Sequence, residues 1–281
     1  MRKKKKSAKL SLKRTGSLME KADKPVEILG LSIFGTRKSE LLRKIWLQRK
    51  EMLHVATVNS EYFMERRANP RFAAALSHSL TVADGWGVVW ANRILNGTPI
   101  PDRREPTIRD RGTIERISGV EIVEEILKHA NERGEKVFLL GAAPGVAELA
   151  ANRMQAKYPG ARLAWWQGAQ TVAVEKSEEA SMTIAKINAE EPDYLLVAYG
   201  SPWQDIWIED NRPYLRVRVA IGVGGVLDEW AGRQAPCPAW LDRNGGKWLW
   251  RLFHEPKRIG RIVRVFGFGL WVWYEKLKEL L

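Results

Sequence analysis

Short apolar runs rich in strand-forming residues recur along this chain, separated by stretches of helical periodicity, and this alternation constrains the fold most strongly. Most runs are continuously apolar, as is typical of strands covered on both faces. The segments between them, such as 121–134 and 145–160, place apolar residues at helical spacing and end at glycine. The predicted strands are VEILGLSI (26–33), HVATVN (54–59), LTVADG (80–85), KVFLLG (136–141), RLAWWQG (162–168), DYLLVAYG (193–200) and RVAIGVGG (218–225).

This alternation predicts an α/β fold, a Rossmann-like and mostly parallel sheet flanked by helices. A length of 281 residues with 45% hydrophobic content suffices for one large domain with an appendage. We expect a basic, disordered extension at 1–24, the Rossmann-like domain at 25–241, and a basic amphipathic helical appendage at 242–281. Residues 98–115 contain three prolines and dense charge of both signs, which indicates an exposed loop.

The formal net charge of +13 belongs to the two ends of the chain. Residues 1–14 carry eight Lys/Arg and no acid, and residues 241–281 carry nine against four Asp/Glu, so the middle is neutral. A neutral core argues against a nucleic-acid partner. The single cysteine, Cys237, excludes an internal disulfide and favours the reducing cytoplasm. The basic N-terminus is not followed by the apolar run of a signal peptide, so neither a leader nor an anchor is expected.

Polar and glycine-rich residues follow several predicted strands, where open α/β sheets bind their ligands. Asp84 alone is more consistent with an ordinary Asp-Gly turn than with a chemical role. Five such loops at one edge favour a chemical role. The candidates are Thr57 and Asn59; Asp84 and Gly85; Gly141 and Gly145 of GAAPG; Gly200 and Gln204 of GSPWQ; and Gly224 and Gly225 of GVGG.

The glycine loops indicate a phosphate ligand, because small residues let backbone N–H groups approach an anion. Neither GAAPG nor GVGGVL is a dinucleotide fingerprint, and no P-loop motif occurs. The chain also lacks the Asp-x-Asp pair that holds a metal-bound nucleotide in many sugar transferases. Arginine, lysine or backbone dipoles must then compensate a diphosphate, and no metal or cofactor is predicted. The histidines, expected to be structural, are His54, His78, His129 and His254.

The C-terminal stretch combines a basic face with an apolar stripe at helical spacing. It is either a helix packed on its own core or an interfacial helix on an anionic membrane. The apolar run 265–273 is too short to span a bilayer, which takes about 20 residues. The arginines are at 251, 258, 261 and 264, and the stripe consists of Ile259, Ile262, Val263, Phe266, Leu270, Trp273 and Leu277.

Taken in chain order, these segments resemble the WecG/TagA/CpsF family of bacterial glycosyltransferases over roughly residues 27–264. The resemblance rests on TVN (57–59), ADGWGVVWA (83–91), RISGVE (116–121), FLLGAAPG (138–145), GSPWQDIWI (200–208), GVGGVLDEWAG (222–232) and WLWRLFHEPKR (248–258) followed by Arg261. It implies metal-independent, inverting transfer of a sugar from a UDP donor to the 4-hydroxyl of polyprenyl-diphosphate-linked N-acetylglucosamine. The sugar is typically N-acetylmannosamine, and the products are cell-surface polysaccharide or teichoic acid.

The resemblance also implies roles for individual residues. Asp84 matches the general base that takes the proton from the acceptor hydroxyl. The other matches are Arg116 and Gln204 beside the catalytic centre, Thr57 and Asn59 in the same pocket, and Arg251, Arg258 and Arg261 over the diphosphates. We add the glycines Gly85, Gly141, Gly145, Gly200, Gly224 and Gly225 to the substrate-binding set, and assign Arg264, Trp271 and Trp273 to the membrane. Departures at Glu121, Trp203, Asp205, Gln234 and Lys247 leave the identities of donor and acceptor open, since other members transfer glucose or other hexoses.

A second hypothesis is a non-catalytic Rossmann-like module that binds a membrane or polyanion through its basic ends, with Asp84 only capping a turn. Release of UDP in the presence of a lipid-linked acceptor separates the two hypotheses. The expected partners are the UDP-sugar, the polyprenyl-linked acceptor and an anionic membrane surface, with a homo-oligomer left open. The expected location is the cytoplasm, peripherally on the inner face of the cell membrane.

Overall fold

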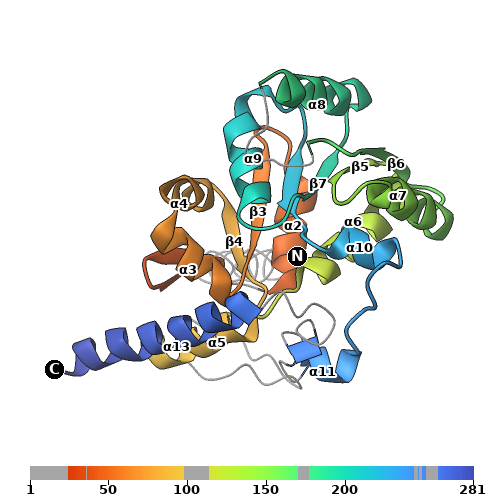
Figure 1. Cartoon of the computed structure of the whole chain (residues 1–281). Coiled ribbons are helices and arrows are strands. Elements are labelled where there is room, and N and C mark those ends of the chain that lie inside the picture. The colour runs from red at the N-terminus through yellow and green to blue at the C-terminus, as the bar shows by residue number, and fades with distance from the viewer. Residues whose placement is uncertain are drawn as a thin grey trace, which may run out of the picture.

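The computed structural model describes residues 25–35, 37–97, 114–169, 177–243, 246, 249–250 and 259–281. The extension at 1–24, most of the 98–115 loop and most of 244–258 lie outside these residues. Six strands form one parallel sheet in the order β4-β3-β8-β7-β5-β6 (Figure 1), which confirms the predicted Rossmann-like architecture. The strands are β3 (Leu53–Val58), β4 (Leu80–Ala83), β5 (Lys136–Gly141), β6 (Arg162–Trp166), β7 (Tyr194–Ala198) and β8 (Val219–Gly222).

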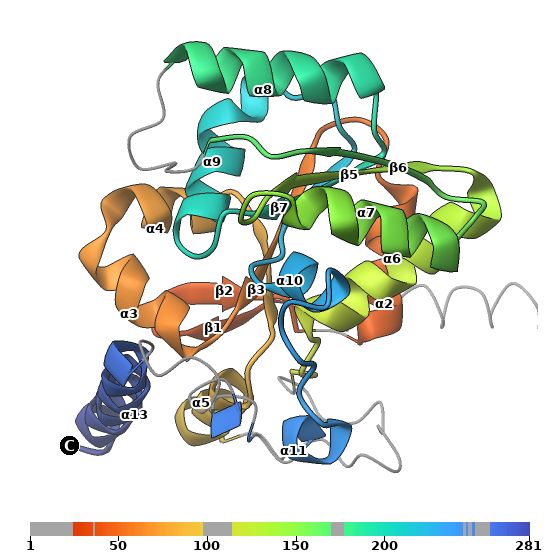
Figure 2. The same cartoon turned by 45° about the vertical axis from the view of Figure 1, so that its right-hand side comes forward.

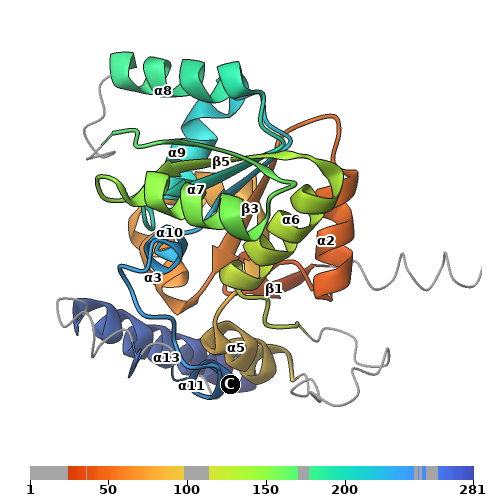
Figure 3. The same cartoon turned by 90° about the vertical axis from the view of Figure 1, so that its right-hand side faces the viewer.

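Helices cover both faces of the sheet because successive strand residues point to opposite sides. In β5, Val137 and Leu139 join one buried cluster, whereas Phe138 and Leu140 join another. Figure 3 views the first face, which is covered by α2 (Lys38–Leu47), α6 (Gly119–Arg133), α7 (Val146–Lys157) and α10 (Val226–Trp230). The other face is covered by α3 (Ser60–Ala68), α4 (Pro70–Ser77), α8 (Ser177–Glu190) and α9 (Trp203–Asn211), as Figure 2 shows.

Residues 26–33, predicted as one strand, instead form a small antiparallel hairpin outside the main sheet. Strand β1 (Val26–Ile28) pairs with β2 (Leu31–Ile33). The prediction was wrong because Leu29 and Gly30 both have positive φ, at 48° and 73°, as in a tight hairpin turn. The hairpin lies beside β4, where the Phe34 N–H donates to the Thr81 carbonyl at 2.8 Å.

The C-terminal helix α13 (Ile259–Leu280) packs against α3 and against α5 (Trp86–Asn96), as Figure 1 shows. Phe268 and Val272 are fully buried in this contact, and the ring centroid of Phe268 lies 5.0 Å from that of Phe63. The helix predicted at the C-terminus is therefore present, and its inner face belongs to the same core as the sheet.

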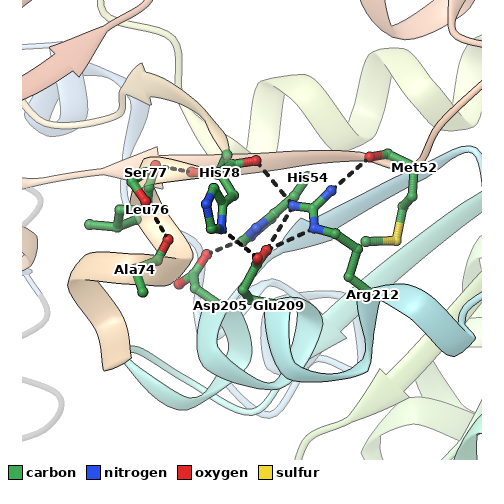
Figure 4. A network of polar contacts seen from close by, with 10 residues as sticks. Met52, His54, Ala74, Leu76, Ser77, His78, Asp205, Glu209 and Arg212 are labelled. Atoms are coloured by element: carbon green, nitrogen blue, oxygen red, sulfur yellow. Dashed lines mark hydrogen bonds and ion pairs between the residues drawn. The ribbon is translucent and has the colours of Figure 1, made fainter. Parts of the chain in front are cut away.

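Ionic contacts and hydrogen bonds attach the C-terminal end of α9 to the residues that precede β3 and β4 (Figure 4). Glu209 accepts hydrogen bonds from Arg212 at 2.8 Å and His78 at 2.7 Å, and Arg212 also donates to the carbonyls of Met52 and His78. Burial acts to raise the pKa of Glu209, but the hydrogen bonds from Arg212 and His78 outweigh it, so the pKa is lowered. These contacts join α9 to β3 and to the turn before β4.

Candidate active site

All six strands of the sheet are parallel, so their carboxyl ends meet at one edge. This edge gathers the residues after β3, β4, β5, β7 and β8, as the sequence predicted. Backbone geometry accounts for two of the glycines there. Gly141 has φ of 94°, and a Cβ on it would lie 2.8 Å from the Tyr199 ring, while Gly224 has φ of 53°.

Asp84 follows β4 directly and sits at the N-terminus of α6. Its N–H donates to the Val58 carbonyl at 2.9 Å, and its Oδ1 accepts the Gly119 N–H at 3.2 Å. The positive end of the helix dipole therefore faces the carboxylate. Oδ2 accepts no hydrogen bond from the part of the chain that the structure describes, and the side chain is half-buried. One carboxylate oxygen is thus fixed in place while the other remains available.

Thr57 and Asn59 lie next to this carboxylate. The Thr57 side chain is buried at the end of β3, and a Cβ on Gly119 would meet it at 3.4 Å. Asn59 caps α3, with Oδ1 accepting the N–H groups of Glu61 and Tyr62. A Cβ on Gly85 would lie 3.3 Å from the Asn59 Cβ. The structure therefore brings Thr57, Asn59 and Gly85 together around Asp84.

Arg116 is held from several sides in the segment before α6. Its two terminal nitrogens donate to the two carboxylate oxygens of Asp242, at 3.1 and 3.3 Å, and its guanidinium lies 5.6 Å from the centroid of the Trp86 ring. Glu121 Oε1 lies 3.9 Å from Arg116 Nη2, and the Arg116 side chain is only 12% exposed. Asp242 belongs to the short helix α11 (Ala239–Arg243), so α11 fixes the arginine. The adjacent residue, Ile117, donates its N–H to Ala83 at 2.7 Å, so Arg116 is close in sequence to the strand end that carries Asp84.

Gln204 lies at the start of α9 and is buried, with both ends of its amide in contact with protein. Oε1 accepts the Gly224 N–H at 2.9 Å, and Nε2 donates to the Tyr62 hydroxyl at 3.1 Å. The structure therefore places Gln204 beneath the glycine loop after β8. The remaining glycines of the set, Gly145, Gly200 and Gly225, lie at the N-cap of α7, after β7 and at the N-cap of α10.

The residues on α13 that were assigned to the membrane differ in their exposure and contacts. Trp273 is half-exposed, whereas Trp271 is partly buried, lies 5.2 Å from the Arg67 guanidinium and donates to Glu275. Arg264 pairs with Glu65 at 3.0 Å. Arg251, Arg258 and the side chain of Arg261 lie outside the described residues. None of the helices described is long and apolar enough to cross a bilayer.

Sequence reasoning missed several residues that support the site. Asp242 and Trp86 hold Arg116, and Tyr62 holds Gln204. Trp86 lies inside a motif that carried the resemblance, but no local pattern indicates Asp242 or Tyr62.

Within the described ranges no cluster of His, Cys, Asp and Glu could hold a metal ion. His54 bonds Asp205, His78 bonds Glu209 and His129 stacks on Trp46, while His254 lies outside those ranges.

The fold and this edge define an α/β enzyme with a carboxylate, an arginine and glycine loops at the ends of parallel strands. The chain belongs to the WecG/TagA/CpsF family of glycosyltransferases, whose profile matches residues 26–280. Similar proteins are the N-acetylglucosaminyldiphosphoundecaprenol N-acetyl-beta-D-mannosaminyltransferases of Staphylococcus aureus strains MRSA252 and MW2. Each is 30% identical to this chain over 245 residues, which cover 85% of this chain and 89% of the relative.

Proposed function

We propose that this protein transfers N-acetylmannosamine from a UDP donor to the 4-hydroxyl of polyprenyl-diphosphate-linked N-acetylglucosamine, inverting the anomeric centre without a metal. Family membership and the names of the S. aureus relatives support the acceptor and the sugar. The observation that carries the proposal is Asp84, whose carboxylate is fixed by the Gly119 N–H at the edge where α/β sheets bind ligands.

Asp84 acts as the general base in this proposal. As the acceptor oxygen forms its bond to the anomeric carbon, its proton passes to Asp84, and the bond from that carbon to the UDP oxygen breaks. A base must lie within about 3 Å of the proton it removes, and a residue at a strand end is held rigidly enough for this. Thr57 and Asn59 line the same region and contact the sugars.

Arginines compensate the negative charge that develops on UDP. Arg116 is the described member of this group, and since one N–H of each terminal nitrogen donates to Asp242, its remaining N–H groups are the ones that reach a phosphate. Arg251, Arg258 and Arg261 complete the group in the C-terminal segment. The glycine loops after β5, β7 and β8 contribute backbone N–H groups to the same anion, apart from the Gly224 N–H, which donates to Gln204.

The acceptor is anchored in lipid, so the enzyme works peripherally at the inner face of the cell membrane. Support comes from the outer face of α13, where Val263, Phe266 and Leu270 are each at least 70% exposed. Trp273 and Leu277 extend this face, and Arg264 lies beside it. Apolar side chains next to basic ones are typical of interfacial helices on anionic lipid.

Asp84→Asn tests the proposal directly. Asparagine retains an oxygen for the Gly119 N–H, so we expect the fold and UDP binding to persist while kcat falls by about 10²- to 10⁴-fold. The assay measures UDP release from UDP-N-acetylmannosamine with a synthetic short-chain polyprenyl-diphosphate acceptor.

The matched control is Asp193→Asn. Asp193 also accepts a backbone N–H, that of Lys136 at 2.8 Å, and pairs with Arg218 at 3.0 Å, but it lies at the opposite edge of the sheet. We expect this variant to turn over normally. Wild-type turnover by Asp84→Asn would remove the base from the mechanism, and absence of UDP release by the wild-type enzyme would favour the non-catalytic module.

A further inference from the structure

A chain of buried polar side chains lies beneath the carboxyl edge and takes no part in the chemistry proposed above. Gly224 donates its N–H to Gln204 Oε1 at 2.9 Å, and Gln204 Nε2 donates to the Tyr62 hydroxyl at 3.1 Å. Tyr62 donates to Asp205 Oδ2 at 2.8 Å. His54 Nε2 lies 3.1 Å from Asp205 Oδ1, as Figure 4 shows for these two residues. The four side chains, His54, Tyr62, Gln204 and Asp205, are each 3% exposed or less. We refer to them as the buried polar chain.

In the buried polar chain, each hydrogen bond is donated in the direction of Asp205. A carboxylate only accepts, so Tyr62 and His54 both donate to it. Burial, and then the Asp205 carboxylate, raise the pKa of Tyr62 well above its ordinary value, so its hydroxyl keeps its proton. With that proton committed to Asp205, the hydroxyl accepts from Gln204. The Gln204 amide consequently has one orientation, with Oε1 toward Gly224.

The buried polar chain joins two sides of the candidate site. Tyr62 lies in the first turn of α3, and its own N–H donates to Asn59 Oδ1 at 3.3 Å. Gln204 packs tightly under the glycine loop, because a Cβ on Gly222 would lie 2.5 to 2.8 Å from its side chain. One tyrosine therefore links the Asn59 side of the site to the 222–225 loop.

We propose that Asp205, Tyr62 and Gln204 are positioning residues that hold the 222–225 loop in the geometry that binds the donor's diphosphate, with His54 completing the partners of Asp205. The inference rests on the proposed function, because that function makes the donor a nucleotide diphosphate. It assigns Gln204 a role through Gly224, where the family resemblance placed Gln204 beside the catalytic centre.

Tyr62→Phe tests this inference, with Tyr194→Phe as its matched control. Tyr194 is also fully buried and donates to a carboxylate, Glu135 at 2.8 Å, but it begins β7 at the opposite edge of the sheet. Tyr62→Phe loses the hydrogen bond to Asp205 and the one from Gln204, whereas Tyr194→Phe loses only the bond to Glu135, so we expect the larger fall in Tm in Tyr62→Phe. Only Tyr62→Phe should lose donor affinity and roughly 10- to 100-fold in kcat/KM, as expected when bound groups are misplaced by about 1 Å.

Coupling between the residues distinguishes positioning from direct contact with the substrate. If Gln204 acts through the buried polar chain, adding Tyr62→Phe to Gln204→Ala lowers kcat/KM no further. Asp205→Asn, which keeps the side-chain shape, should reproduce the Tyr62→Phe defect. If Tyr62→Phe and Asp205→Asn match the Tyr194→Phe control while Gln204→Ala alone loses activity, Gln204 touches the substrate and the inference is overturned.

Amide hydrogen exchange gives a readout that does not depend on turnover. We expect exchange in peptides covering the 222–225 loop to be faster in Tyr62→Phe and unchanged in Tyr194→Phe. Unchanged exchange in both variants would overturn the positioning role even if the enzyme is active. Turnover by the wild-type protein separately decides the proposed function, so the two failures can be told apart.

Discussion

Arg116 shows how one side chain near the site is prepared before substrate binds. Asp242 accepts hydrogen bonds from both terminal nitrogens of Arg116, and Trp86 lies against the Arg116 guanidinium. The plane of the guanidinium is therefore fixed. Such a geometry depends on a planar fork of donors, which lysine does not have. The conformational entropy of this long side chain is therefore lost when the protein folds, and not when the substrate binds.

We expect Arg116→Lys to lower kcat by roughly tenfold, equal to about 1.4 kcal/mol of transition-state stabilisation, because the charge remains while the paired geometry is lost. Steady-state kinetics with the short-chain acceptor measure the effect. Arg71→Lys is the control, since Arg71 pairs with Asp210 on an exposed surface at 2.6 Å. Equal activity of the two variants would show that the guanidinium geometry is unimportant.

The residues at strand ends could be predicted from sequence, whereas their supports could not. Asp84 and Asn59 each follow an apolar run, and parallel strands necessarily bring such positions together. The contact of Arg116 with Asp242 joins residues 126 positions apart, and that of Tyr62 with Asp205 joins residues 143 apart. Neither contact belongs to a repeating local pattern, so only the folded chain reveals it.

At the scale of elements, α13 presents two apolar faces. Phe268 and Val272 on the inner face are buried against α3 and α5, and the outer face exposes Phe266 and Leu270. Sequence periodicity indicated an apolar stripe and left two interpretations open, packing on the core or contact with membrane. The inner face fits the first interpretation, and the outer face is the one that we propose contacts membrane.

The outer face of α13 is tested by Phe266→Ser combined with Leu270→Ser. Because burying a Phe or Leu side chain contributes about 1.5–3 kcal/mol, we expect affinity for anionic vesicles to fall by roughly tenfold or more. Co-sedimentation with vesicles measures binding, and turnover of the short-chain acceptor should be unchanged. Leu47→Ser, at a similarly exposed leucine on α2, should leave vesicle binding intact. An equal loss in that control would indicate nonspecific adhesion.

The hairpin at 26–33 marks the limit of reading elements from apolar runs. Gly30 carries the usual signal for positive φ, but Leu29 adopts it as well, at 48°, which is unfavourable for a leucine. The turn therefore depends on the packing of β2 beside β4 and of β1 beside α5, and the run alone looks like one buried strand.

At the scale of the whole molecule, the basic excess lies at the ends of the chain and the middle is neutral. The carboxyl edge is supplied by a neutral sheet domain, and the C-terminal segment adds Arg251, Arg258 and Arg261 to it in our proposal. Charge compensation for a diphosphate then comes from arginines drawn from separate parts of the sequence.

Compensation of the diphosphate by arginines predicts that turnover does not depend on a divalent metal. A metal ion would neutralise the leaving diphosphate, and the chain contains no Asp-x-Asp pair to hold one. We expect the EDTA-treated enzyme to turn over as fast as untreated enzyme. Conversely, Arg258→Ala should lose activity that added Mg²⁺ or Mn²⁺ does not restore, because the missing charge is a fixed part of the protein. A requirement for either ion, shown by activity that returns in proportion to the metal added, would mean that the arginines alone do not compensate the diphosphate.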